Sequence, residues 1–249
     1  MRFKDYFSTQ SIDYAKYRPP YPRALFEYLA SLTVSHEKAW DCATGNGQAA
    51  LGLTPFFERV IATDASKSQL DHAPEHEKII YREATAEKTE IESESIDLVT
   101  VAQALHWLDL DGFYREAKRV LRPGGALAVW CYNLLEISPA IDQKIEEYYR
   151  DIVGPYWAPE RVLVEDGYRS IDFPFKELDA PSIHMQAMWS LADLLGYLRT
   201  WSATQEYIRL RGSDPVESIA DNLSAVWGAV EEEKSVRWPL HIRVGLLPA

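Results

Sequence analysis

The stretch that decides the fold is DCATGNGQAA, at residues 41–50. It follows the short apolar run 39–42, which predicts a strand, and leads into a helical pattern that continues through Phe56. Gly45 and Gly47 permit the backbone conformations of a tight turn and let a helix begin abruptly. A strand, a glycine turn and a helix in this order are typical of an open α/β sheet that binds a ligand beside the turn.

Short apolar runs alternate with helical patterns from this stretch as far as Tyr132. We expect a helix over 111–121, closed by RPGG at 122–125. We expect four further strands, at 60–63, 79–81, 96–102 and 126–131. Five strands with intervening helices predict an α/β fold with a doubly wound parallel sheet.

The two flanks of this core differ from it in pattern. Residues 1–36 are rich in aromatic residues and proline, and Pro22 suits the first turn of a helix. The stretch 154–189 has no clear period. We expect helices over 140–152, 191–201 and 215–230, and a last strand over 236–244. The second half therefore looks like an insertion plus a closing strand on one sheet.

The composition is that of a globular protein with excess negative charge. Acids outnumber bases 38 to 26, for a net charge of −12, and neither half is basic. This disfavours a nucleic-acid partner, because phosphate neutralisation needs clustered lysine and arginine. Cys42 and Cys131 lie in apolar runs, which indicates buried thiols and a cytoplasmic protein. No apolar run approaches the roughly 18 residues of a membrane span, so no membrane partner is expected.

Two acids bear on what the glycine turn binds. Asp64 ends the second predicted strand, where an acid accepts hydrogen bonds from both ribose hydroxyls of a nucleoside. The spacing of Gly45, Gly47 and Ala50 matches the dinucleotide fingerprint, but Asp41 would repel a pyrophosphate. S-adenosylmethionine has no phosphate, and its ammonium group would be attracted. The turn favours S-adenosylmethionine over a nicotinamide dinucleotide. The alternative is that both acids only cap the turn and the next helix.

The order of motifs resembles class I S-adenosylmethionine-dependent methyltransferases, and within them the trans-aconitate methyltransferase-like, methyltransferase type 11 branch. The matching segments are 7–10, 14–19, 41–47, 63–66, 84–87, 95–99, 102–109, 119–125 and 197–202. The resemblance implies a Rossmann-like, mostly parallel seven-stranded sheet with helices on both faces. It also implies one domain over 1–249, made of an N-terminal lid at 1–36, a cofactor-binding core at 37–132 and an acceptor-side insertion with a closing strand at 133–249.

Position by position, the resemblance implies a site for S-adenosylmethionine and its product S-adenosylhomocysteine. The segment 41–47 would surround the methionine end, Asp64 would hold the ribose, and Ala65 and Leu70 would cover the adenine. The implied cofactor-binding residues are Asp41, Ala43, Thr44, Gly45, Asn46, Gly47, Asp64, Ala65, Ser66, Leu70, Thr85, Ala86, Glu87, Gln103 and Ala104, with Phe7, Tyr14 and Arg18 from the lid.

Two positions depart from the family's pattern. Thr85 stands where the family commonly has an acid that accepts from the adenine amino group, so a hydroxyl or a backbone carbonyl must replace it. Ala43 replaces the first glycine of the turn, which implies a modest backbone adjustment.

The segment 103–107 follows the fourth strand, where the family lines the floor between cofactor and acceptor. His106 is the histidine placed for proton transfer, as a general base. The alternatives are a structural imidazole and acceptor binding without proton transfer. Arg199 would meet an anionic acceptor. The expected acceptor-binding residues are His106, Trp107, Tyr132, Arg199 and Trp201.

The expected reaction is an in-line transfer of the methyl group to a small-molecule acceptor, with a carboxylate or hydroxyl oxygen favoured. A carboxylate would need no base. The alternatives are a catalytically silent S-adenosylmethionine-binding module and an NAD-dependent oxidoreductase. We expect a monomer or a weak homodimer. We also expect no metal, because Pro74 interrupts the zinc-type string HAPEH at 72–76.

Overall fold

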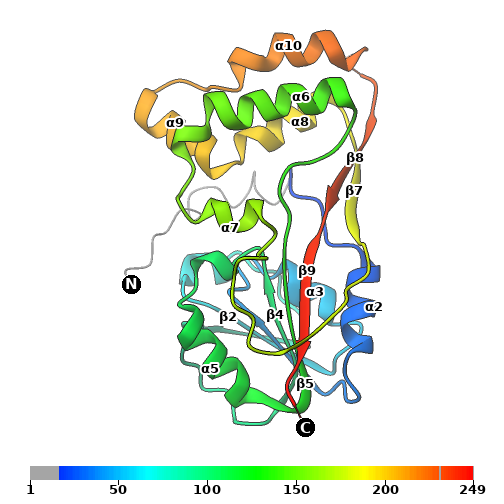
Figure 1. Ribbon diagram of the computed structural model, residues 1–249, viewed down its shortest axis with the longest axis vertical. Coiled ribbons are helices and arrows are strands. Elements are labelled where there is room, and N and C mark those ends of the chain that lie inside the picture. Colours follow the sequence, from blue (N-terminus) through cyan, green and yellow to red (C-terminus); the bar gives the residue numbers. More distant parts are fainter. Residues whose placement is uncertain (1–16, 230, 249) are drawn as a thin grey trace.

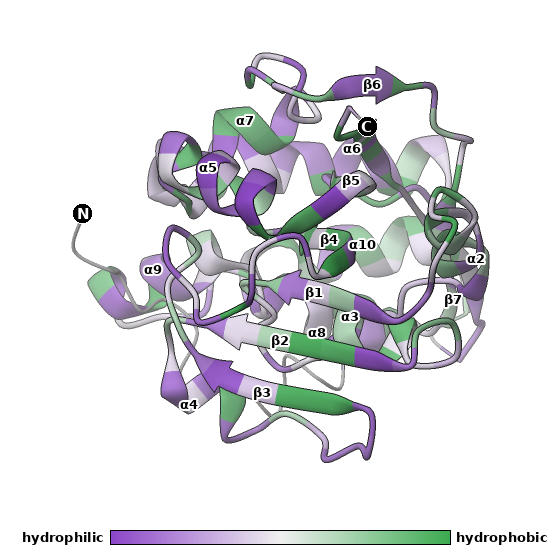
Figure 2. Ribbon diagram, turned by 90° about the horizontal axis from the view of Figure 1, so that it is seen from below, coloured by the Kyte–Doolittle hydropathy of each residue, from purple (hydrophilic) through white to green (hydrophobic). Residues whose placement is uncertain are grey.

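A seven-stranded sheet forms the body of the protein in the computed structural model, which describes residues 17–229 and 231–248 (Figure 1). Its strands are β1 (Lys38–Cys42), β2 (Arg59–Asp64), β3 (Ile79–Glu83), β4 (Ile96–Ala102), β5 (Leu121–Cys131), β6 (Lys176–Leu178) and β9 (His241–Leu246). Their order is β3-β2-β1-β4-β5-β9-β6, and Figure 2 shows the first five side by side. β9 runs in the opposite direction to the other six strands. The expected Rossmann-like, mostly parallel sheet is confirmed.

The sheet has its switch point between β1 and β4. The chain runs from β1 outward to β2 and β3, then returns to place β4 on the other side of β1. Neighbouring connections therefore diverge at the carboxyl ends of β1 and β4, and this is where open α/β sheets hold their ligands. The register sets Asp41 of β1 opposite Thr100 of β4.

The sheet divides the apolar core into two layers. Alternate residues from Ala126 to Trp130 of β5 belong to one buried cluster, and those from Leu127 to Cys131 belong to the other. This is the period of two expected of a strand buried on both faces. Helices cover both layers, as expected: α2 (Arg23–Ser31) and α3 (Gln48–Leu53) lie on one face, and α5 (Leu110–Val120) lies on the other (Figure 1).

Four helices, which we call the helical cap, stand beyond one end of the sheet (Figure 1). They are α6 (Pro139–Glu147), α8 (Leu191–Arg199), α9 (Ser202–Arg211) and α10 (Glu217–Trp227). The two-stranded sheet of β7 (His184–Trp189) and β8 (Lys234–Pro239) joins the cap to the body. The short helix α7 (Arg161–Glu165) lies between the cap and the body. Buried aromatic side chains such as Tyr148 and Trp201 make the cap continuous with one layer of the core.

The second half corrects several sequence predictions. The single strand expected over 236–244 is wrong: β8 ends at Pro239 and β9 begins at His241, in different sheets. Pro239 has no amide hydrogen to extend a ladder, and the chain changes sheet there. The stretch 154–189, expected to be irregular, contains α7, β6 and β7. The helix α9 was not expected. The RPGG segment lies within β5, opposite a register shift in β4.

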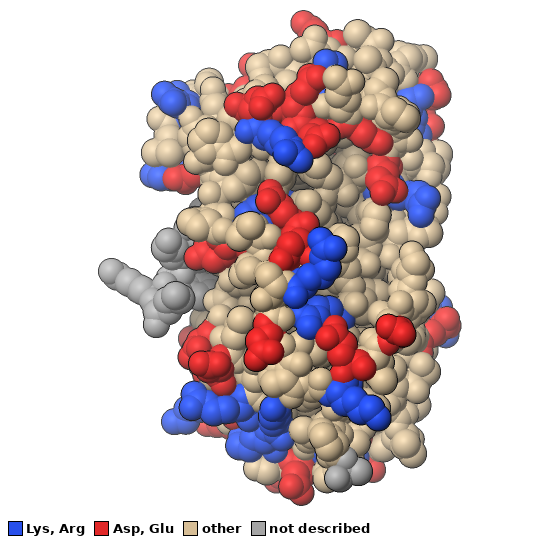
Figure 3. Space-filling view, viewed as in Figure 1, with Lys and Arg blue, Asp and Glu red and all other residues tan. Residues whose placement is uncertain are grey.

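The remaining short elements are α4 (Lys67–Leu70), η1 (Leu105–Trp107), η2 (Tyr148–Ile152) and η3 (Gly154–Tyr156). Both cysteine thiols are buried and free, as expected. Within the described residues, no helix has the length and apolarity needed to cross a membrane. On the face in Figure 3, acidic and basic side chains are interspersed.

Candidate active site

The glycine turn leaves β1 through three left-handed backbone positions. Ala43 has a φ of 54°, Gly45 of 56° and Gly47 of 81°. The amide of Thr44 donates to the carbonyl of Thr63, at 2.9 Å, so the turn is held against β2. Helix α3 then begins immediately after Gly47. The turn thus brings its backbone to the carboxyl ends of β1 and β2, as the sequence predicts.

Ala43 is strained in this turn, since a left-handed conformation costs a residue with a Cβ atom about 1–2 kcal/mol. We expect Ala43→Gly to leave the free energy of unfolding unchanged or to raise it by up to about 1 kcal/mol, because relief of strain offsets the greater freedom of the unfolded chain. The matched control Ala49→Gly, inside α3, should lower it by about 1–2 kcal/mol. Urea unfolding measures both. Equal losses in the two variants would show that Ala43 is not strained.

Asp41 is fully buried at the end of β1. Its carboxylate accepts hydrogen bonds from the hydroxyls of Thr44, at 2.5 Å, and Thr100, at 2.8 Å. Burial raises the pKa of Asp41 to about 6, although the two hydroxyls oppose the shift, and the nearby Asp64 carboxylate adds to it. The negative charge of Asp41 beside the turn therefore disfavours a phosphate and favours a cationic group.

Asp64 joins the turn to the end of β2. Its Oδ2 accepts from the amide of Gly45, at 2.8 Å, and its Oδ1 accepts from the amide of Ser66, also at 2.8 Å. Each carboxylate oxygen has two lone pairs and can accept more than one hydrogen bond. Ser66 caps α4 by accepting from the amide of Gln69.

The residues expected around the adenine follow β2 and β3. Ala65 and Leu70 are half-buried next to the turn, and Ala86 is buried. Thr85 is exposed and forms an isolated bridge with Lys88. Glu87 is half-buried and packs against Gly112 of α5.

Tyr81 of β3 was not predicted for this site. A Cβ atom on Gly47 would lie 2.4 Å from the Tyr81 hydroxyl oxygen, so the phenol lies directly against the glycine turn. That hydroxyl donates to the carbonyl of Pro74 at 3.1 Å. Burial raises the pKa of Tyr81 to about 12, so it remains a neutral phenol. Sequence spacing alone gave no signal for this contact, since it joins β3 to a turn more than 30 residues earlier.

Gln103 and Tyr132 clamp the ends of β4 and β5 together. The Gln103 side chain accepts from the amide of Tyr132, at 2.8 Å, and donates to its carbonyl, at 3.1 Å. The Tyr132 hydroxyl accepts from Arg18 at 2.8 Å, and the Arg18 guanidinium also lies 4.9 Å from the centre of the Tyr197 ring. Residues from the N-terminal segment, the sheet and the cap therefore meet here. Phe7 and Tyr14 lie outside the described residues.

His106 lies on η1, directly beyond β4 and half-buried. Its Nδ1 shares a hydrogen bond of 2.8 Å with the hydroxyl of Tyr168, which is fully buried. Burial, aided by the positive charge of Arg161, lowers the pKa of His106 to about 3. Burial also holds the pKa of Tyr168 well above its ordinary value. The pair is neutral at physiological pH.

His106 should therefore carry no charge between about pH 5 and pH 8, where a histidine of ordinary pKa titrates. We expect its ring ¹⁵N signals to be constant over this range. The Arg161→Gln variant should raise the pKa, because it removes a repelling charge. Unfolding frees the imidazole, so this group makes the fold less stable as the pH falls below about 6.5. A ring titration near pH 6.5 in the wild type would contradict the buried neutral state.

The residues predicted to bind the acceptor lie in different surroundings. Trp201 is buried in an aromatic cluster with Tyr149 and Trp157, at ring separations of 5.7 Å to each. The Trp107 ring lies next to that of His106, at 4.6 Å between ring centres and tilted by 45°. Arg199 instead pairs with Asp214, at 2.6 Å between Nε and Oδ2, so its charge is already matched inside the cap.

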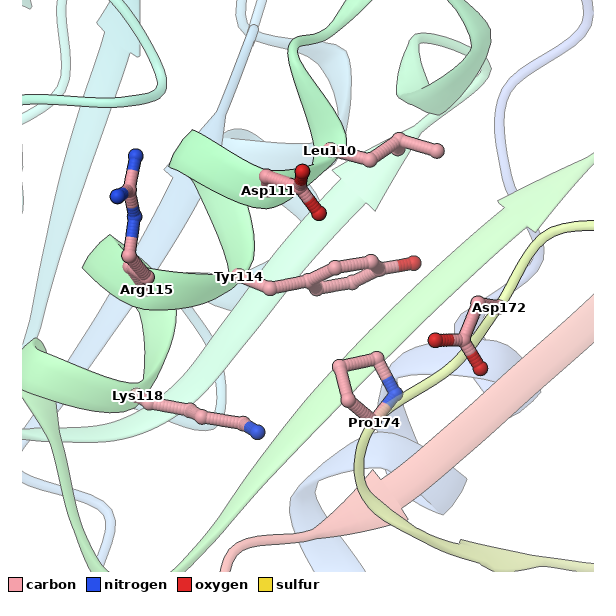
Figure 4. A pocket seen from close by; sticks show the side chains of 7 residues that line it. All are labelled: Leu110, Asp111, Tyr114, Arg115, Lys118, Asp172 and Pro174. Carbon is pink, nitrogen blue, oxygen red and sulfur yellow. The ribbon is translucent and has the colours of Figure 1, made fainter.

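A surface hollow of about 290 Å³ on α5 lies apart from these residues (Figure 4). It is lined by Leu110, Asp111, Tyr114, Arg115, Lys118, Asp172 and Pro174, none of which was predicted for the site. Its charges are mixed, and its walls come from α5 and from the segment that contains Asp172 and Pro174. In the described part of the chain, no group of three or more histidine, cysteine or acidic side chains could hold a metal ion.

Known proteins with similar sequences and structures bear on this geometry. The family described as a methyltransferase domain matches residues 40–129. A Dictyostelium discoideum protein, provisionally named a methyltransferase, is 32% identical over 97% of this chain and 94% of its own. A solved structure from Anaeromyxobacter dehalogenans, provisionally described as a type II methyltransferase, is 44% identical and has a TM-score of 0.88. It covers 93% of this chain and 99% of its own.

The chain therefore belongs to the methyltransferase family, and it is an S-adenosylmethionine-dependent enzyme of class I fold. A Saccharomyces cerevisiae protein, provisionally named an S-adenosylmethionine-dependent methyltransferase, is 25% identical over 85% of this chain and 84% of its own. A Haemonchus contortus phosphoethanolamine N-methyltransferase, solved with S-adenosyl-L-methionine, shares the fold alone, with 16% identity and a TM-score of 0.52 over 99% of this chain and 58% of its own.

Proposed function

We propose that the enzyme methylates an oxygen of a small-molecule acceptor, a carboxylate or a hydroxyl, and releases S-adenosylhomocysteine. The observation that carries the cofactor part is the arrangement of Asp41 and Asp64 around the glycine turn. The acceptor part rests on the neutral state of His106 and on the aromatic surroundings at the carboxyl end of β4.

The residues of the turn fit S-adenosylmethionine. When bound, it supplies a methyl group already activated on a sulfonium. The buried Asp41 carboxylate near the turn suits a cation and opposes the pyrophosphate of a dinucleotide. Asp64 would accept from the ribose hydroxyls, and Ala65 and Leu70 would contact the adenine. Asp41 would attract the ammonium group through its charge.

His106 is a weak base in this environment, so a proton transfer to it at neutral pH is disfavoured. A carboxylate acceptor is already ionised and needs no base, whereas a hydroxyl acceptor does. The neutral His106 therefore favours a carboxylate oxygen over a hydroxyl. In this proposal His106 orients the acceptor by hydrogen bonding, and Tyr168 fixes the ring of His106 from behind.

Turnover with methyl-labelled S-adenosylmethionine tests the proposal. Matched acids and alcohols, such as phenylacetic acid with phenylethanol and hexanoic acid with hexanol, would serve as acceptors. We expect label in base-labile esters of acids and release of S-adenosylhomocysteine. Methyl-labelled ethers, with no labelled esters, would show that the acceptor is a hydroxyl and not a carboxylate. Tight cofactor binding with no product from any acceptor would instead identify a silent binding module.

Several finer sequence predictions accompany this proposal. They are the trans-aconitate methyltransferase-like branch, a lid formed by residues 1–36, an acceptor-side insertion within 133–249, and a monomer or weak homodimer acting in the cytoplasm. Within 1–36, α2 packs on the sheet, so a lid would be formed by the residues that precede it. The contacts of Arg18 with Tyr132 and Tyr197 support the lid, because they connect the N-terminal segment to both the sheet and the cap.

A further inference from the structure

Arg161 is a half-buried cation that the sequence analysis did not predict for the site. It begins α7, the short helix between the cap and the body. Three other half-buried arginines face acids: Arg119 pairs with Glu116, Arg199 with Asp214 and Arg243 with Glu177. Within residues 17–229 and 231–248, Arg161 has no ion pair with an acidic side chain.

Neutral groups hold the Arg161 guanidinium in place. Nε donates to the hydroxyl of Tyr149 at 2.8 Å, and one Nη donates to the side-chain oxygen of Asn133. The guanidinium lies 4.5 Å from the centre of the Trp157 ring. The Tyr149 hydroxyl donates in turn to Glu165, at 2.5 Å, which leaves its lone pairs facing Arg161. The cation is thus oriented by neutral partners, and its charge is not neutralised by them.

The charge of Arg161 acts on the acceptor side of the site. It lowers the pKa of His106, after burial, and opposes the rise that burial causes in the pKa of Cys131. It therefore lies near the carboxyl ends of β4 and β5. A guanidinium has five N–H donors in a planar fork, and the two hydrogen bonds above leave further donors for a ligand. A partly desolvated, unneutralised cation is costly unless an anion joins it.

We propose that Arg161 is the residue that receives a carboxylate of the methyl acceptor and so determines specificity for acidic acceptors. This inference rests on the proposed function, because it places an acceptor beyond β4. The planar fork matches the geometry of a carboxylate, and the half-buried Trp157 beside it supplies an apolar surface for the rest of the molecule. The pairing orients the acceptor. It does not require that the paired carboxylate be the group that is methylated.

Binding of acid and amide pairs to the S-adenosylhomocysteine complex tests this assignment. The probes are phenylacetate with phenylacetamide and hexanoate with hexanamide, measured by calorimetry on the full chain. We expect the wild type to bind each acid at least about 30-fold more tightly than its amide, since the amide leaves the cation unpaired. In Arg161→Gln the acids should fall to the affinity of the amides. Arg161→Lys should lose part of the preference, because it retains charge but not the fork.

Controls separate this inference from the proposed function. Arg150→Gln, which removes an exposed arginine paired with Glu146, should retain the preference for acids. S-adenosylhomocysteine should bind Arg161→Gln as it binds the wild type. A loss of that binding would assign Arg161 to the cofactor and overturn the inference. The inference would also be overturned if the wild type bound acids and amides equally well, or if it bound neither. Loss of the preference in Arg199→Gln alone would transfer the role to Arg199. Failure of the wild type to bind S-adenosylhomocysteine would instead overturn the proposed function.

Discussion

Replacing Asp41 by asparagine is expected to make the protein more stable and its cofactor binding weaker. The buried carboxylate has a pKa of about 6, above the ordinary value of 3.8 for an aspartate. Ionisation therefore lowers the free energy of unfolding as the pH rises between these two values. The penalty at pH 7.5 is about 3 kcal/mol, at 1.36 kcal/mol per pKa unit. Asparagine keeps the shape and removes the charge. The ammonium group of the cofactor would then lose its partner, for a loss of about 10- to 100-fold in affinity.

Urea unfolding at pH 4 and pH 7.5 measures the first effect, and calorimetry with S-adenosylhomocysteine measures the second. The stability gain of Asp41→Asn should be present at pH 7.5 and nearly absent at pH 4, where the wild-type carboxyl is protonated in the fold. Thr44 and Thr100 must accommodate the amide, so Asp41→Ala serves as the comparison that breaks their hydrogen bonds. A variant that is less stable than the wild type at both pH values, with unchanged affinity, would contradict the role given to Asp41.

Replacing Asp64 by alanine is expected to damage both the fold and the cofactor site. The amides of Gly45 and Ser66 would lose their acceptor. An unsatisfied buried amide costs about 1–3 kcal/mol, so the loss in unfolding free energy should be about 2–4 kcal/mol. The proposed ribose contact would disappear as well. We expect affinity for S-adenosylhomocysteine to fall by at least about 100-fold, from two lost hydrogen bonds to a charged group.

Asp64→Asn separates the two effects, since its side-chain oxygen still accepts one of the amides. It should recover part of the stability and little of the affinity, because an amide is a weaker acceptor for two hydroxyls. Thermal unfolding and calorimetry on the same samples give both quantities. Unchanged affinity in a folded Asp64→Ala protein would remove the ribose assignment.

The part of the fold that sequence predicts well is local in origin. The strand, glycine turn and helix around Gly45 are set by adjacent residues, and β5 is recognisable from the continuous apolar run 126–131, as expected of a strand buried on both faces. Asp41 and Asp64 were found because each ends a strand next to the turn. The break at Pro239 was missed, because an alternating pattern continues through it while the chain changes sheet.

The residues that sequence missed come to the site through tertiary packing. Tyr81 reaches Gly47 from another strand, and Tyr168 reaches His106 from 62 residues away. Arg161 lies in a stretch without a period, so nothing local marked it. Arg199, which was predicted to meet an anion, is neutralised by Asp214 fifteen residues later. The sequence alone does not show which arginine forms an ion pair with an acidic side chain and which does not.

Calorimetry of the purified wild-type protein with S-adenosylmethionine, S-adenosylhomocysteine and NAD tests the central claim most directly. The account predicts that the first two bind at one site and that NAD does not bind, because Asp41 opposes a pyrophosphate at the glycine turn. Binding of NAD without binding of either S-adenosyl compound would contradict the account. It would mean that the turn holds a phosphate despite the charge of Asp41.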